Sequence, residues 1–103
     1  MPERLAAAFA LLQEKRALAI VYVLLKGPQG FNDIARAAGS VNPATLTHRL
    51  GRMEQAGLVT KTVQSVMPPR TLYALTDAGE ALRPVIKAFE AWARQHPINE
   101  GGC

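Results

Sequence analysis

The sequence has few of the residues from which metal and thiol centres are built. Its 103 residues include one cysteine and two histidines, which are widely separated. Because metal ligands come from clusters of such side chains, we predict no metal site. The single cysteine, Cys103, cannot form an intramolecular disulfide, in agreement with a reducing compartment. We expect Cys103 to be an inert tail thiol, or to join two chains under oxidation.

Long hydrophobic runs are also missing. The most apolar run, near residues 17–25, is about half the length that a membrane span needs. A long helical segment precedes it, which does not fit a cleavable signal. We therefore expect no transmembrane helix and a cytoplasmic protein. Repeats and linkers are absent from the sequence, which predicts one domain at 1–96 and a loose tail at 97–103.

Acidic residues are fewer than basic ones, 8 against 12, so the net charge is +4. This balance weakly favours a polyanionic partner such as DNA. An enzyme is disfavoured, because Asp33, Glu54 and Asp77 fall on separate predicted elements. The sequence contains no nucleophile–base pair and no glycine-rich phosphate loop. We predict no catalytic site and no cofactor.

The most informative stretch is Asn42–Gly57, which predicts one short helix. Asn42 is a good N-cap and Pro43 suits the first helical position, where a missing N–H is tolerated. Gly57 can adopt the left-handed conformation that ends a helix. The apolar residues recur at helical spacing and predict one buried face: Leu46, Leu50 and Met53.

The opposite face of this helix is polar and basic and carries no carboxylate of its own. It is formed by Ala44, Thr45, His48, Gly51, Arg52 and Gln55, with Arg49 on the flank. Such a face can lie in the major groove of DNA. Taken alone, it could equally be the solvated face of an ordinary amphipathic helix. The segments on either side decide between these interpretations.

Three helices are predicted before this stretch. The first covers 2–13, and the second covers 17–25, where periodicity alone leaves a buried strand open. A helix is favoured there because Lys26-Gly27-Pro28 is a stop signal, and 27–30 is expected to be a turn. The third helix covers 31–38, with Asn32 as cap and Gly39 as terminator. With the helix after Asn42, it forms a predicted helix-turn-helix motif.

A β-hairpin is predicted after this motif. Residues 58–63 and 71–75 are rich in strand-forming residues, and 64–70 holds two prolines and is expected to be the loop. A hairpin at this place is a wing. Arg70 at its tip and Lys61 on its first strand could reach phosphates or the minor groove.

The last predicted helix runs from Thr76 or Asp77 to about Gln95. Asp77 and Glu80 are expected to form a capping box, and Pro84 to kink the helix without ending it. Its apolar stripe could be core, but the other elements already supply an inner layer, so we predict a two-fold dimer interface. The expected interface residues are Leu5, Phe9, Leu12, Leu82, Val85, Ile86, Phe89 and Trp92.

These elements predict a mostly α (α+β) winged helix-turn-helix domain. The chain resembles the HxlR-type transcriptional regulators of bacteria over nearly its whole length. The resemblance is carried by Phe31-Asn32, Leu46-Thr47, Arg49-Leu50, Gly57-Leu58-Val59, the Pro-Arg-x-x-Tyr run at 69–73, Leu75-Thr76, Pro84-Val85 and Trp92. It implies a DNA-binding homodimer that regulates nearby genes, with the terminal helices forming the dimer interface.

The chain departs from the family pattern at three places. Members often carry a cysteine before the first helix, used by some for redox or electrophile sensing. This chain begins with Met1-Pro2 at about that point, which leaves thiol sensing unsupported. Glu14-Lys15-Arg16 replaces the usual Gly-Lys-Trp before the second helix. Asn42 stands where serine is common, with the same capping chemistry.

The candidate DNA-binding residues are Asn42, Thr45, Thr47, His48, Arg49, Arg52, Lys61 and Arg70. Arg49 and Arg52 could contact guanine or neutralise phosphates, and the sequence does not separate these roles. The alternatives are a winged helix used for protein contacts and a nonspecific architectural DNA-binding protein. A cavity between the buried helix and the dimer helices could hold a small-molecule effector, but no residue identifies one.

Overall fold

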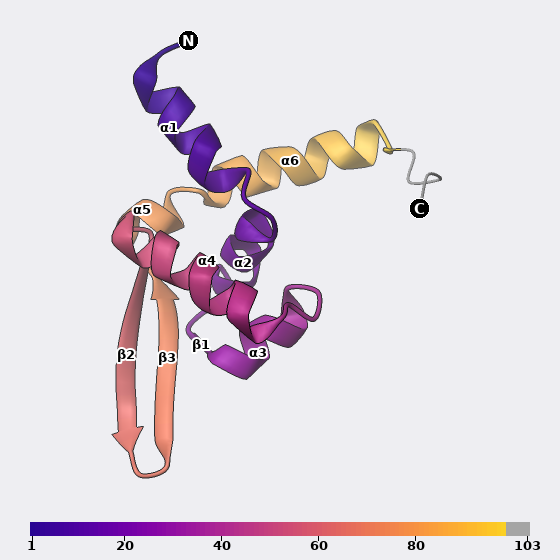
Figure 1. Ribbon diagram of the computed structural model, residues 1–103. Coiled ribbons are helices and arrows are strands. Elements are labelled where there is room, and N and C mark those ends of the chain that lie inside the picture. The colour runs from indigo at the N-terminus through magenta and orange to yellow at the C-terminus, as the bar shows by residue number, and fades with distance from the viewer. Residues whose placement is uncertain (99–103) are drawn as a thin grey trace.

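The structure, a computed structural model, describes residues 1–98 (Figure 1). Most of the tail predicted at 97–103, and the expectations for Cys103, lie outside the described residues. The elements are α1 (Glu3–Leu12), α2 (Ala17–Leu24), β1 (Gln29–Gly30), α3 (Phe31–Ala37), α4 (Pro43–Gln55), β2 (Val59–Val66), β3 (Pro69–Leu75), α5 (Asp77–Glu80) and α6 (Arg83–Gln95). The predicted winged helix-turn-helix fold is confirmed, with three helices before α4 and a wing after it.

Helix α2 is the centre of the core, which confirms the helical interpretation of 17–25. Most of its side chains are buried, including Ile20, Val21 and Leu24. They pack with buried residues of α3, of the α3–α4 connection, of α4 and of β2, namely Ile34, Ala38, Val41, Leu46, Leu50, Met53 and Val59. Burial on several sides explains why the run is almost wholly apolar and shows no clear helical period.

Helix α4 begins and ends where the sequence predicts. Asn42 caps it, because its Oδ1 accepts hydrogen bonds from the backbone N–H of Ala44 at 2.8 Å and of Thr45 at 3.4 Å. Gly57 follows the helix with a φ of +82°, in the left-handed region that glycine adopts without strain. The apolar face predicted for this helix is buried, with each of its three side chains at most 1% exposed.

The segment before α3 differs from the prediction. Residues 27–30 were expected to be a turn, but Gln29 and Gly30 form the strand β1, which pairs with Tyr73 and Leu72 of β3. Gly30, in an extended conformation, is then the N-cap of α3, so the prediction that Asn32 caps this helix is wrong. Two residues are too few for a sequence pattern, and the strand exists only because β3 lies beside it.

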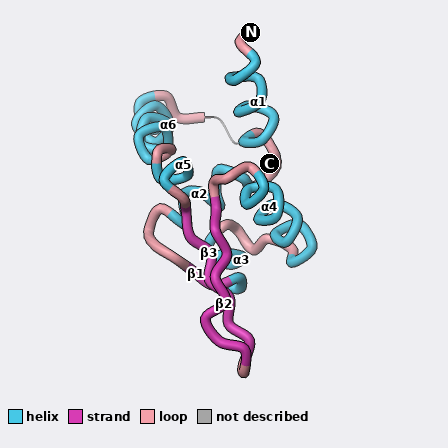
Figure 2. Tube along the Cα trace, turned by 90° about the vertical axis from the view of Figure 1, so that its left-hand side faces the viewer, coloured by secondary structure: helices cyan, strands magenta, loops and turns pink. Residues whose placement is uncertain are grey.

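The wing is longer than predicted. The sheet is antiparallel with the order β1-β3-β2, and β2 pairs with β3 from Val59↔Leu75 to Val66↔Pro69. The loop expected at 64–70 is therefore reduced to Met67 and Pro68. Pro69 is the first residue of β3, a position where the missing N–H of proline is tolerated. Figure 2 shows this hairpin extending away from the helices.

The last predicted helix is in fact two helices. Helix α5 ends at Glu80 and α6 begins at Arg83, so the expectation that Pro84 only kinks one helix is wrong. A proline inside a helix removes a backbone bond and clashes with the preceding turn. It is accommodated here in the first turn of a new helix. The predicted capping box is also wrong, because Thr76 rather than Asp77 is the N-cap of α5, and the Glu80 carboxylate pairs with Arg83 at 2.8 Å.

Thr76 caps α5 and ties it to the end of α4. Its hydroxyl accepts from the N–H of Gly79 at 3.2 Å and donates to the carbonyl of Gly57 at 2.6 Å. Its backbone N–H donates to the carbonyl of Leu58 at 2.9 Å. A Cβ on Gly79 would overlap the Leu58 carbonyl oxygen and lie 2.8 Å from a methyl group of Leu75. The joint between the wing, α4 and α5 therefore requires glycine at this position.

Helices α1 and α6 lie on the side of the molecule away from the wing tip (Figure 1). Neither has a buried side chain, although Leu82 and Ile86 are partly buried against the core. Within residues 1–98, no helix combines the length and the apolar character that crossing a bilayer requires. Two helices of this chain thus remain mostly outside its core.

Candidate nucleic-acid interface

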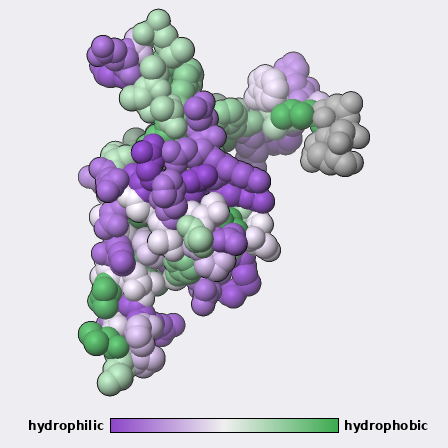
Figure 3. Space-filling model, viewed as in Figure 1, coloured by the Kyte–Doolittle hydropathy of each residue, from purple (hydrophilic) through white to green (hydrophobic). Residues whose placement is uncertain are grey.

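The outward face of α4 is polar and accessible. Thr47, His48, Gly51 and Arg52 are exposed there, whereas Thr45 is half-buried. An alanine-sized side chain at Gly51 would meet no atom within 4 Å, so the helix backbone is open to an approaching molecule at this point. Figure 3 shows a largely hydrophilic surface across the middle of the molecule, where α4 runs.

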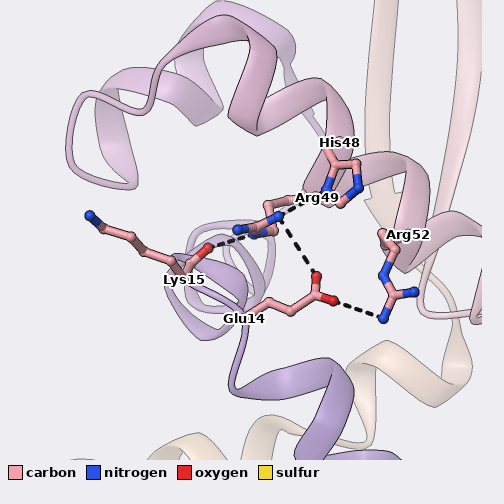
Figure 4. A network of polar contacts seen from close by, with 5 residues as sticks. All are labelled: Glu14, Lys15, His48, Arg49 and Arg52. Atoms are coloured by element: carbon pink, nitrogen blue, oxygen red, sulfur yellow. Dashed lines mark hydrogen bonds and ion pairs between the residues drawn. The ribbon is translucent and has the colours of Figure 1, made fainter.

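A carboxylate from another part of the chain lies against this face. Glu14, in the corner between α1 and α2, contacts both arginines of α4 (Figure 4). Its Oε2 lies 2.7 Å from Nη2 of Arg52, and its Oε1 lies 3.9 Å from Nη1 of Arg49. No carboxylate of α4 pairs with these two arginines among the described residues, and the fold supplies one from the α1–α2 corner.

Arg49 is engaged within the protein. Its Nε donates to the backbone carbonyl of Lys15 at 2.8 Å, and its Nη1 lies 2.9 Å from Nδ1 of His48. The side chain is only 19% exposed, against 45% for Arg52. Arg49 therefore joins the α1–α2 corner to α4, and Arg52 is the more accessible of the two guanidinium groups.

Asn42 also has a role within the fold. Its side-chain oxygen is occupied by the two N-cap hydrogen bonds. Its side-chain amide group is a donor and remains on an exposed residue at the end of α4. The same residue can therefore fix the start of the helix and still face a ligand there.

The wing carries positive charge along its strands, and its tip is apolar. Lys61 and Arg70 are exposed, and Arg70 faces Ser65 across the hairpin rather than lying at the tip as predicted. The tip itself presents Val66 and Met67, the latter 90% exposed, and the end of the hairpin is correspondingly hydrophobic in Figure 3. The sequence 58–75 contains no acidic residue, so the wing suits an anionic partner.

An apolar groove lies between α1 and α6. It has a volume of about 460 Å³ and is lined mainly by hydrophobic side chains. The lining residues are Leu5, Ala8, Phe9, Leu12, Gln13, Leu18, Leu82, Val85 and Phe89. Phe89 is 55% exposed and Trp92, further along α6, is 53% exposed. The structure thus brings together most of the residues predicted for the dimer interface.

Comparison with known proteins identifies the family. The model of the HxlR-like helix-turn-helix family matches residues 11–100. The chain belongs to this family. Among its relatives is the HTH-type transcriptional regulator YodB of Bacillus subtilis (strain 168), which is 33% identical over 95 residues, covering 92% of this chain and 85% of YodB. Another is the uncharacterized HTH-type transcriptional regulator YvaP of the same strain, which is 34% identical over 95 residues, covering 92% of this chain and 88% of YvaP.

A solved structure agrees with this assignment. The reduced form of the transcriptional regulator YodB from B. subtilis has a TM-score of 0.82 and 32% identity, covering 94% of this chain and 95% of that one. This HxlR-like protein is therefore a DNA-binding transcriptional regulator of the helix-turn-helix class, and it is not an enzyme.

Sequence reasoning missed two residues beside the candidate interface of this HxlR-like chain. They are Glu14, which pairs with α4, and Lys15, whose carbonyl accepts from Arg49 while its side chain is exposed. Their partners lie 34 or more residues away, so no local spacing could identify them. The only available signal was the unusual charge of 14–16 at the start of a buried helix.

Proposed function

We propose that this protein is a sequence-specific transcriptional regulator that binds a palindromic operator as a homodimer. The proposal depends chiefly on one observation: α4 is fixed by its cap and its buried face, and it presents an accessible polar face outward. A helix held in this way can enter the major groove without losing side-chain contacts that the core needs.

The N-terminal half of α4 is proposed to read bases. Thr45, Thr47 and His48 lie there, and in helix-turn-helix docking this half enters the groove most deeply. Hydroxyl and imidazole groups can donate to or accept from base edges. Asn42 is proposed to offer its amide to a phosphate close to the start of the helix.

Charged groups are proposed to hold the backbone on either side. Arg52 lies towards the C-terminal end of α4, and Lys61 and Arg70 lie on the wing. Arg49 is proposed to contribute a smaller part, because most of its guanidinium group is engaged within the protein. The wing would then lie along flanking phosphates or in the adjacent minor groove.

The second copy is proposed to cover the apolar surface of α1 and α6. Exposed aromatic and aliphatic side chains in a contiguous groove are typical of an interface core. A two-fold dimer would place two α4 helices about one turn of B-DNA, roughly 34 Å, apart. The operator would then be a palindrome with matching half-site spacing.

Fluorescence anisotropy with promoter fragments would test this proposal. We expect one fragment to bind about a thousandfold or more tighter than a scrambled duplex, with log K falling steeply as log salt rises. Replacing Arg70 with alanine should make that slope shallower by about one for each phosphate that the arginine neutralises. Binding without fragment preference would indicate an architectural DNA-binding protein, and binding that ignores salt would contradict the proposal.

A further inference from the structure

Glu14 is placed to control how the recognition helix uses its positive charge. It lies in the corner that follows α1, and its side chain is 21% exposed. It makes a close ion pair with Arg52, and it lies at longer range from Arg49 (Figure 4). One carboxylate thus faces both guanidinium groups of α4.

The Glu14 carboxylate and a DNA phosphate would compete for the guanidinium group of Arg52. Both are oxyanions that accept hydrogen bonds from guanidinium, and arginine binds each of them well. Contacts to phosphates supply nearly all of the affinity for DNA of arbitrary sequence. A carboxylate that occupies Arg52 therefore lowers nonspecific binding more directly than it affects base reading by the N-terminal half of the helix.

The same ion pair ties the α1–α2 corner to α4. Helix α1 has no buried side chain, so few other interactions hold it to the recognition helix. Arg49 binds the Lys15 carbonyl of the same corner, and Arg52 lies with α1 residues around a shallow hollow. The core already fixes the backbone of α4, so these contacts hold the arginine side chains rather than the helix.

We propose that Glu14 is a positioning residue that determines specificity: it holds Arg52 on the protein, which weakens binding to arbitrary DNA more than it weakens base reading by the N-terminal half of α4. The proposal rests on the DNA binding proposed above. It gives a function to the Glu14 carboxylate, a negative charge beside the face of α4 that is proposed to bind negatively charged DNA.

The test compares Glu14→Gln with Glu54→Gln. Both variants remove one negative charge, and Glu54 lies exposed on α4 with no ion pair to any residue in 1–98. Fluorescence anisotropy at several salt concentrations would measure the affinity for a scrambled duplex. The duplex would be about 30 base pairs long, enough for two half-sites and their flanks. Melting temperatures and far-UV circular dichroism would establish that each variant is folded.

We expect Glu14→Gln to bind the scrambled duplex several-fold more tightly than the wild type does. Its plot of log K against log salt should steepen by up to about 1.8, since each protomer of a dimer can then neutralise one more phosphate. Glu54→Gln should change both quantities much less. Preference for the duplex best enriched in a wild-type genomic selection should fall in Glu14→Gln. Adding Arg52→Gln to this variant should remove the increase in slope.

Each contrary result has a distinct meaning. If Glu14→Gln and Glu54→Gln behave alike, only overall charge matters and this inference is overturned. If folded Glu14→Gln binds the scrambled duplex more weakly, Glu14 is merely a scaffold residue, and the inference is again overturned. If the wild type binds no DNA at all, the proposed function fails, and this inference fails with it.

Discussion

Helices α4 and α6 share a length of 13 residues and a proline in the first turn, yet they use their apolar faces in opposite ways. The apolar side chains of α4 are buried within the protomer. On α6, Val85, Phe89 and Trp92 remain substantially exposed. The difference shows that an apolar stripe on a helix does not by itself mean burial within the same chain. In the proposed dimer, a second copy would cover the stripe of α6.

The largest expected effect concerns the buried face of α4. Replacing Leu50 with alanine should lower the free energy of unfolding by about 2–5 kcal/mol, because a cavity remains in a close-packed core. Urea denaturation would measure the loss. The matched control is Val63→Ala on the exposed surface of the wing, which should change stability by about 0.5 kcal/mol or less. Equal effects of the two substitutions would show that α4 is not anchored as described.

The second effect concerns the exposed face of α6. Replacing Phe89 with serine should weaken self-association by about 30-fold or more, the scale of an aromatic interface anchor. Sedimentation velocity over a range of concentrations would measure this change. Met67→Ser at the wing tip is the control, since it also removes an exposed apolar side chain. Unchanged self-association of the Phe89 variant would place the dimer interface elsewhere.

A smaller effect on stability is expected at the N-terminus of α4, which has a side-chain cap that α6 lacks. Asn42 caps α4 through its side chain, whereas Leu82, at the corresponding position of α6, makes no such bond. Asn42→Ala should therefore cost about 1 kcal/mol of stability in thermal or urea unfolding. Asn42→Ser should recover most of it, because serine also accepts from the first-turn N–H groups. A destabilised serine variant would mean that Asn42 stabilises the fold in some other way.

The smallest expected effect is an increase in stability rather than a loss. Gly51→Ala should raise stability by up to about 1 kcal/mol, since alanine favours the helix and its Cβ meets no neighbour. Gly79→Ala should instead lower stability, because its Cβ would overlap the joint beside α5. Differential scanning calorimetry of both variants would measure the two shifts. A loss of stability in the Gly51 variant would show that another group approaches α4 there.

Local signals in the sequence predicted much of the fold. Asn42 and Gly57 marked the ends of α4 because helix caps depend on residues within one turn. The apolar run at 17–25 was correctly interpreted as the central helix, helped by the stop signal after it. The hairpin was also found, although its strands extend closer to Pro68 than the two prolines suggested.

The features that were missed depend on distant parts of the chain. Strand β1 exists only beside β3, and its two residues carry no period of their own. The pair of Glu14 with Arg52 joins segments that only the tertiary fold brings together. At Pro84 the sequence pattern predicted a kink, whereas α5 ends at Glu80 and α6 begins at Arg83. The candidate DNA-binding residues are all exposed or half-buried, and their contact with DNA stays a prediction.

The joint at Thr76 and Gly79 has a consequence for how such a regulator can diversify. It connects the end of α4 to the chain that leads into α6, and it does so through backbone carbonyls and a residue without a side chain. In the proposed dimer, this joint would help to set the distance between half-sites, whereas the outward residues of α4 would set the bases preferred. Operator preference could then change by surface substitution while the spacing of the proposed palindrome stayed the same.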